Sequence, residues 1–265
     1  MRTESIKKKL WDAVRPLHSP FTKAVRKRLG QNYFHHPEME LPPAYEAVQL
    51  EAERRLHHYL HTSADAVKQI VIVGAHEGHE IPRMRYSYPR ARFLCFEPSP
   101  RWYDELARNF RDVDYVETRA LALSEKPGMA TFYELPLAGN GSLLEPDMER
   151  WAEFNRVAAQ ESTSFPVTVS TLDEETRVLE QIDLLWMDVQ GAEGNVLKGA
   201  SETLLRTQSI FLEVALCNPV YQGTMLFREV DEILNGFGFS CVLLGTDGSN
   251  YSGNALWVRD VDQRE

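Results

Sequence analysis

The feature that most constrains this chain is an alternation, from Lys68 to Asp260, of short apolar runs with longer segments of helical periodicity. Parallel strands need crossover connections that are usually helical, so this alternation favours a parallel sheet. We expect strands at 69–74, 92–97, 119–123, 182–188, 209–215 and 239–244, an antiparallel last strand at 254–258, and helices at 99–110, 191–206 and 224–236. The fold class is therefore α/β and Rossmann-like, with helices on both faces of a mostly parallel, seven-stranded sheet.

Two further parts complete the expected organisation. An N-terminal helical extension over 1–64 precedes the main domain at 65–265, with short helices within 4–29 and a longer helix over 43–61. Short β segments at 129–134 and 166–169 flank an insertion in the 140s and 150s.

The N-terminal arm is basic, whereas the chain as a whole is acidic. The first 30 residues carry nine basic and two acidic side chains, a net charge of +7, while the whole chain has a net charge of −10. Two interpretations stay open. The arm is either a basic amphipathic helix for peripheral contact with an anionic membrane, or a segment that packs on its own domain or on a second subunit of a homo-oligomer.

Composition narrows the function classes. An odd number of cysteines, three, without metal-ligand spacing favours a reducing, cytoplasmic location. We see no apolar run of transmembrane length and no secretory signal. The acidic domain does not interleave basic with aromatic residues, so we expect no nucleic-acid partner.

The first strand leads directly into the glycine loop Gly74–Gly78, where bare backbone is expected to let a ligand approach. A dinucleotide fingerprint requires a second glycine where this chain has His76, which would crowd a pyrophosphate. The loop therefore favours a cofactor without phosphate over NAD. Glu97 ends the second strand 19 positions after Gly78, a spacing that suits a carboxylate binding ribose hydroxyls.

Several motifs together resemble one family. They are Val73–Gly78, Phe96–Pro100, Thr171–Asp173, Ile182–Ala200, the late Glu213 and Asn254–Leu256. These segments resemble the FkbM-type family of S-adenosylmethionine-dependent O-methyltransferases over about residues 68–260. The resemblance implies a class I methyltransferase fold and methyl transfer to a hydroxyl, often of a sugar or glycosylated natural product.

The resemblance also implies a cofactor site. Its expected residues are Gly74, Ala75, His76, Glu77, Gly78, Glu97, Pro98, Ser99, Leu123, Ser124 and Asp188, with Ala122 also near the adenine.

A hydroxyl acceptor needs help with deprotonation, so we expect catalytic groups at the strand ends: Asp188, Glu213 and His79. A divalent metal held by Asp188, Glu213 and a histidine is a further interpretation. The acceptor, a saccharide or glycosylated small molecule, is expected to contact Asn140, Ser142, Gln190, Glu193 and Asn218.

Three positions depart from the family pattern. Ile72 stands where the family has an acid, Trp186 where it has Lys, and Gln190 where it has Glu. These departures motivate an alternative function, a non-catalytic protein that binds S-adenosylmethionine or another metabolite on the same fold.

Overall fold

The structure is a computed structural model and describes residues 44–135, 139–155, 162–246 and 251–260. The predicted helices within 4–29 and the basic arm lie outside these residues. Among the described residues, no helix combines the length and the apolar character that crossing a bilayer requires.

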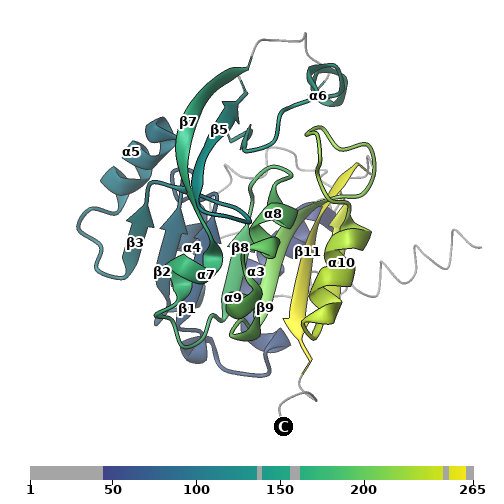
Figure 1. Cartoon of the computed structure of the whole chain (residues 1–265). Coiled ribbons are helices and arrows are strands. Elements are labelled where there is room, and N and C mark those ends of the chain that lie inside the picture. Colours follow the sequence, from purple (N-terminus) through teal and green to yellow (C-terminus); the bar gives the residue numbers. More distant parts are fainter. Residues whose placement is uncertain (1–43, 136–138, 156–161, 247–250, 261–265) are drawn as a thin grey trace, which may run out of the picture. The chain divides into compact units, whose positions relative to one another are not determined.

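The main sheet has seven strands in the order β10-β11-β9-β8-β1-β2-β3. β11 runs antiparallel to both of its neighbours, and every other pairing in the sheet is parallel. This confirms the predicted mostly parallel sheet and its reversed last strand (Figure 1). The strands are β1 Gln69–Val73, β2 Arg92–Phe96, β3 Val116–Arg119, β8 Leu184–Met187, β9 Ser209–Ala215, β10 Phe239–Thr246 and β11 Ser252–Arg259.

Helices bury both faces of this sheet, because alternate residues of each central strand point to opposite sides. In β1, Val71 and Val73 join one core cluster, whereas Ile70 and Ile72 join the other. The first cluster is covered by α7 Leu172–Thr176, α8 Glu193–Lys198, α9 Ser201–Leu205 and α10 Phe227–Gly236. The second is covered by α3 Ala44–Tyr59, α4 Glu80–Ser87 and α5 Pro100–Asn109.

The described helix α3 belongs to the same compact unit as the sheet, Pro43–Glu265. It packs on the sheet through Val48, Ala52 and Leu56, all of which are buried in the second core cluster. The apolar face of α3 is covered by β10 and β11, and the domain boundary expected after residue 64 stays a prediction.

A predicted strand at 119–123 is wrong in its position. The third strand of the main sheet is β3, Val116–Arg119, which is an edge strand and therefore tolerates the polar residues Glu117 and Thr118. The apolar run that suggested a strand follows it, and its last two residues form β4, Ala122–Leu123, in a different sheet.

This second sheet has four strands in the order β4-β7-β5-β6, and it rises above one end of the main sheet (Figure 1). β5 Gly128–Glu134 and β7 Thr163–Ser170 confirm and extend the two predicted β segments, and β6 Gly141–Ser142 joins the far edge. The insertion between β6 and β7 contains α6, Met148–Asn155.

The single predicted helix at 191–206 is two helices, α8 and α9, separated at Gly199. A Cβ at Gly199 would lie 2.2 Å from the carbonyl oxygen of Ser124, so this residue lets the two backbones touch. α4 and α7 were not predicted, because five to eight residues give too little helical periodicity to detect.

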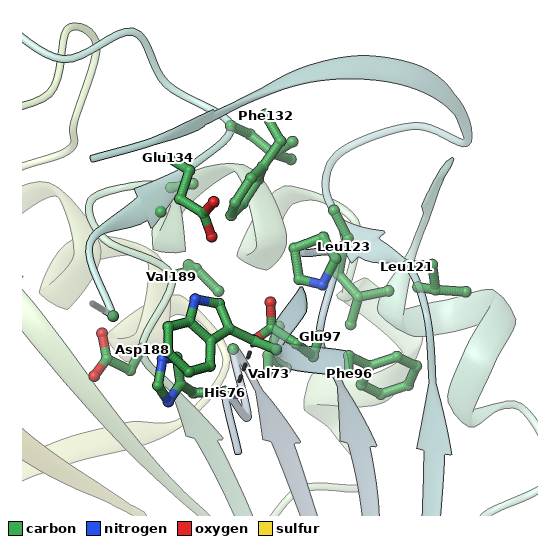
Figure 2. A pocket seen from close by; sticks show the side chains of 18 of the residues that line it. Val73, His76, Phe96, Glu97, Leu121, Leu123, Phe132, Glu134, Asp188 and Val189 are labelled. Atoms are coloured by element: carbon green, nitrogen blue, oxygen red, sulfur yellow. Dashed lines mark hydrogen bonds between the residues drawn. The ribbon is translucent and has the colours of Figure 1, made fainter. Parts of the chain in front are cut away.

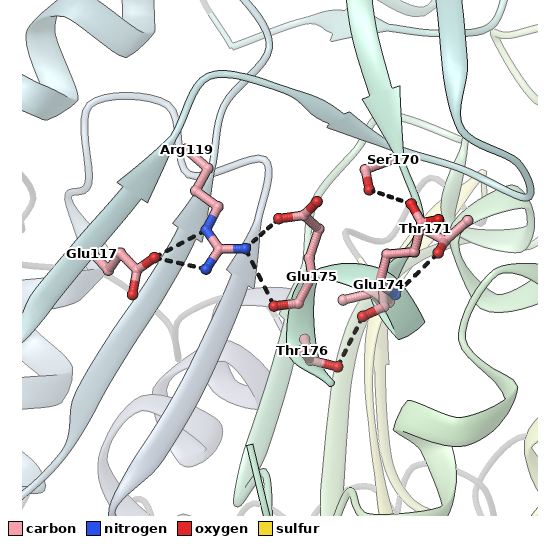
Figure 3. A network of polar contacts seen from close by, with 8 residues as sticks. Glu117, Arg119, Ser170, Thr171, Glu174, Glu175 and Thr176 are labelled. Atoms are coloured by element: carbon pink, nitrogen blue, oxygen red, sulfur yellow. Dashed lines mark hydrogen bonds and ion pairs between the residues drawn. The ribbon is translucent and has the colours of Figure 1, made fainter. Parts of the chain in front are cut away.

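A polar network fastens the edge strand β3 to α7 (Figure 3). The guanidinium of Arg119 donates to Glu117 at 2.7 Å and pairs with the carboxylate of Glu175 on α7. Thr171 caps the start of α7 by accepting the backbone N–H of Glu174 at 3.2 Å. The network thus fastens the chain just before β4 to the helix that follows β7, the strand with which β4 pairs. Ala122 and Leu123 of β4 line the cavity described below.

Candidate functional site

A cavity of about 270 Å³ opens beyond the carboxyl ends of β1, β2 and β8, beneath the second sheet (Figure 2). Ligands of open α/β sheets bind at this edge. The cavity is lined by Val73, Gly74, His76, His79, Glu80, Phe96, Glu97, Pro98, Trp102, Leu121, Ala122, Leu123, Phe132, Glu134, Gly139, Gly141, Leu143, Trp186, Asp188, Val189 and Ala192.

Two loop glycines pack closely against other parts of the protein. A Cβ at Gly74 would lie 1.9 Å from the carbonyl oxygen of Asp188, and its φ is +81°. A Cβ at Gly78 would lie 2.5 Å from the ring of Phe110 and 2.9 Å from Leu106. Gly74 therefore lets the end of β1 touch the end of β8, and Gly78 lets the loop settle against α5.

Glu97 is held rigidly at the end of β2. One carboxylate oxygen accepts the backbone N–H of His76 at 2.8 Å, and the other accepts that of Ser99 at 2.9 Å. Burial raises the pKa of Glu97 to about 7, although these two N–H donors favour the ionised form. The loop thus orients a carboxylate in a cavity, which suits a residue that binds ribose hydroxyls.

A second carboxylate reaches the cavity from above, from β5 of the second sheet. Glu134 accepts a hydrogen bond from the hydroxyl of Ser99 at 2.9 Å, so the sheet and the Glu97 turn are joined across the site. In Figure 2 the carboxylates of Glu97 and Glu134 face the same space, and the carboxylate of Asp188 lies at its left side. Phe132 lies one step away on the same face of β5 and closes the apolar end of the cavity.

Two aromatic rings, His76 and Trp102, are in contact beside the loop that follows β1. The imidazole of His76 contacts the indole of Trp102 on α5, with ring centroids 3.8 Å apart. Burial lowers the pKa of His76, which keeps the ring neutral, and its buried Nε2 atom has no hydrogen-bond partner among the described residues. His76 has a φ of +49°, a conformation held by the N–H bond to Glu97.

The charges of the cavity define what it can bind. Its described lining includes Glu80, Glu97, Glu134 and Asp188, and it includes no Lys or Arg. Phosphate groups are usually held by basic side chains, which this described lining does not supply. The acidic lining favours a ligand that carries positive charge.

Asp188 and Glu213 lie on neighbouring strand ends and are linked by one amide. The side-chain nitrogen of Gln190 donates to Asp188 at 2.8 Å and to Glu213 at 3.2 Å. Asp188 is an exposed residue, and desolvation by the surrounding protein raises the pKa of its carboxyl group. Gln190 has a φ of +53°, and this backbone turn aims its amide back at the two acids.

A second, smaller cavity of about 100 Å³ lies on the other side of this bridge. It is lined by Asn140, Trp151, Gln190, Gly191, Glu193, Glu213, Val214, Ala215, Asn218, Pro219, Val220, Tyr221, Thr224, Tyr251 and Ser252. Burial next to Glu213 and Asp188 raises the pKa of Tyr221. Tyr221 is 6% exposed, and its buried hydroxyl has no hydrogen-bond partner among the described residues.

Some of the predicted site residues line one of the two cavities, and the others do not. Of the expected cofactor residues, Gly74, His76, Glu97, Pro98, Leu123 and Asp188 line the larger cavity, whereas Ala75, Glu77, Gly78, Ser99 and Ser124 do not. Of the expected acceptor residues, Asn140, Gln190, Glu193 and Asn218 line the smaller one.

Ser142 lines neither cavity, because its hydroxyl is buried and bonded to the N–H of Leu144 at 3.0 Å. Glu193 also stabilises the turn before α8, because its carboxylate accepts hydrogen bonds from the backbone N–H groups of Val189 at 3.1 Å and Gly191 at 3.3 Å. Burial raises the pKa of Glu193 to about 7.

The expected catalytic residues occupy different places. Asp188 lines the larger cavity and Glu213 the smaller one. His79 lines the larger cavity, but its side chain is 68% exposed and pairs with Glu77. Among the described residues, no group of three or more His, Cys, Asp or Glu side chains is arranged to hold a metal ion.

Several lining residues were not expected from the sequence, among them Glu80, Trp102, Phe132 and Glu134. Phe132 and Glu134 are two residues apart on the predicted segment 129–134, so the sequence predicts that they share one face of a strand. It does not predict that this face lies over the main sheet. Of the family departures, Trp186 is stacked on Phe211 with centroids 3.8 Å apart, and Ile72 is buried in the core.

The strand order of the main sheet, with β11 antiparallel between β10 and β9, is that of the class I methyltransferase fold. The model of the FkbM methyltransferase domain matches residues 73–241, and the chain belongs to this family. It is therefore a methyltransferase, and the family implies S-adenosylmethionine as methyl donor.

Two curated relatives agree with this assignment. The 2-O-methyltransferase NoeI of Sinorhizobium fredii is 32% identical over 176 residues, which cover 63% of this chain and 71% of that protein. The methyltransferase sdnD of Sordaria araneosa is 33% identical, over 50% of this chain and 60% of that protein. Among solved structures, Aeropyrum pernix fibrillarin with bound S-adenosyl-L-methionine matches with a TM-score of 0.43 and 15% identity, covering 78% of this chain and 73% of that one.

Proposed function

We propose that the protein transfers a methyl group from S-adenosylmethionine to a hydroxyl of a saccharide or glycoconjugate. The observation that carries the proposal is the pair of cavities on either side of the Asp188–Gln190–Glu213 bridge. One cavity suits a cationic nucleoside and the other suits a polar acceptor.

The larger cavity fits the methyl donor in three respects. Glu97 presents a fixed carboxylate for the ribose hydroxyls. Leu121, Leu123 and Phe132 provide an apolar end for a base. The four acidic side chains favour the positive charge that the sulfonium and the ammonium group carry.

The smaller cavity fits a sugar. Its described lining combines the aromatic rings of Trp151, Tyr221 and Tyr251 with amide and carboxylate groups, and includes no Lys or Arg. Such walls bury the apolar face of a sugar ring and bond its hydroxyls, and they do not neutralise an anion. The acceptor ring is accordingly neutral or amino-substituted, and it carries no phosphate, sulfate or carboxylate next to the reacting hydroxyl.

Asp188 is the proposed base. The pKa of Asp188 is raised, and a carboxylate with a higher pKa is a stronger proton acceptor. Bound S-adenosylmethionine would supply the methyl group with its thioether as leaving group, and Asp188 would take the proton that the acceptor hydroxyl gives up. Gln190 holds Asp188 in position, Glu213 contacts the acceptor from the smaller cavity, and His79 stands at the rim as a second proton acceptor.

Two measurements test this function. Calorimetry with S-adenosylhomocysteine and NAD is expected to show binding of the first and none of the second. Labelled methyl transfer to matched neutral, amino, carboxylated and sulfated oligosaccharides is then expected to favour the first two. Binding of S-adenosylhomocysteine without transfer to any acceptor would instead support the non-catalytic alternative, and absence of binding would refute both.

A further inference from the structure

Glu80 is a cavity carboxylate that lies outside every motif described above. It is the first residue of α4, and its side chain lines the larger cavity. The neighbouring position on β1 from which the family resemblance would lead one to expect an acid holds Ile72, which is 1% exposed and buried in the core. The sheet itself therefore supplies no charge at this point.

Ile72 and the helix α4, which carries Glu80, lie on the same side of the main sheet. Ile72 packs in the core cluster that also contains Ile81 of α4 and Cys95 of β2. Glu80 lines the cavity, and its charge also raises the pKa of Cys95 in this core cluster. An acid projecting from α4 thus reaches the region that an acid on β1 at position 72 would otherwise reach.

The partner of Glu80 within the protein is shared with a second acid. Arg83 pairs with Glu53 of α3 at 2.7 Å and with Glu80 at 3.5 Å. Glu53 is 1% exposed, so this short pair is deep and the longer contact neutralises Glu80 only in part. Burial raises the pKa of Glu80, so an additional cation in the cavity would favour its ionised form.

The other three acids of the cavity accept hydrogen bonds from other residues, whereas Glu80 accepts one from its own backbone N–H. Glu97 accepts two backbone N–H groups, Glu134 accepts the Ser99 hydroxyl, and Asp188 accepts the Gln190 amide. Glu80 has the weaker ion pair and is the carboxylate best able to gain from a ligand cation.

We infer that Glu80 binds the α-ammonium group of S-adenosylmethionine and replaces, from a helix, the acid that the strand lacks at Ile72. This role rests on the proposed function of the cavity. It makes Glu80 a determinant of affinity for the amino-acid end of the donor, with no contact to its nucleoside.

The test removes first the amino-acid end of the ligand and then the charge of Glu80. Calorimetry compares S-adenosylhomocysteine with 5′-methylthioadenosine, which lacks the amino-acid end, on the full chain, on Glu80→Gln and on Glu105→Gln. Glu105 is a control because it lies on α5 outside the cavity, paired with Arg108 on the surface. Loss of one charge-assisted hydrogen bond predicts a fall of about 10-fold or more for S-adenosylhomocysteine in Glu80→Gln, with methylthioadenosine unchanged and both ligands unchanged in Glu105→Gln.

Equal loss for both ligands in Glu80→Gln would show a structural role and overturn the inference, as would equal affinity of the variant and the unaltered chain. Should the variant fail to fold, desamino-S-adenosylhomocysteine on the unaltered chain gives the same answer. Its affinity is expected to be about 10-fold or more below that of the parent ligand, and equal affinity would overturn the inference. If the unaltered chain bound none of these ligands, the proposed function itself would fail.

Discussion

The pKa of Glu97 makes a quantitative prediction about ligand binding. The ionised carboxylate can accept hydrogen bonds from ribose hydroxyls, and protonation removes part of this capacity. Since burial raises the pKa of Glu97 to about 7, affinity for S-adenosylhomocysteine is expected to weaken as pH falls through 7. Most other carboxylates would produce such a change only at a much lower pH.

The magnitude follows from the pKa. At pH 5.5, protonated Glu97 must lose its proton to bind the ribose, at a cost of about 2 kcal/mol, since one pKa unit corresponds to about 1.4 kcal/mol. Affinity should therefore be about 30-fold lower at pH 5.5 than at pH 8.5. Glu97→Gln removes the titrating group, and loss of a charged acceptor predicts binding about 10- to 100-fold weaker at pH 8.5.

Calorimetric titration of both proteins with S-adenosylhomocysteine between pH 5.5 and 8.5 measures these effects. Glu80 and Asp188 also have raised pKa values, so the relevant quantity is the difference in slope between the two proteins. The ionisation of the ligand cancels in the same difference. Equal slopes, or unaltered affinity in Glu97→Gln, would refute the assigned role of Glu97.

Three further predictions concern the loop, the bridge and the base. Gly74→Ala should reduce the free energy of unfolding by at least about 2 kcal/mol more than Gly223→Ala in urea, because both have φ above +80° but only Gly74 has a close neighbour; equal losses would contradict the close approach. Gln190→Glu replaces a donor that bonds Asp188 and Glu213, so kcat should fall about 10-fold or more, and an unchanged kcat would count against the bridge. Asp188→Asn should lower kcat about 100-fold or more while S-adenosylhomocysteine affinity changes much less, and comparable turnover would exclude Asp188 as base.

The sequence predicted the central sheet well because period and spacing carry that information locally. Gly74–Gly78 after β1 and Glu97 after β2 are local signals at strand ends, and the structure brings both to one cavity. The apolar run before Ser124 led to the wrong position for the third strand, because residues that line a cavity are as apolar as residues of a buried strand. β3, by contrast, is polar because it is an edge.

The rest of the site could not be read from the sequence because it depends on distant parts meeting. Glu134 reaches the cavity only when β5 folds over the main sheet, and its bond to Ser99 joins residues 35 positions apart. The glycines illustrate a different limit. Gly74 was correctly placed in the loop, but its reason is a backbone contact with Asp188, more than 100 residues later.

The single amide of Gln190 has a thermodynamic consequence. Because one nitrogen serves both Asp188 and Glu213, an acceptor that engages Glu213 must change the share of that hydrogen bond left to Asp188. Occupancy of one cavity then alters the free energy of occupying the other, and linkage requires the influence to be equal in both directions. Donor and acceptor would thus bind as an interdependent pair, with the bridge acting as the coupling element between them.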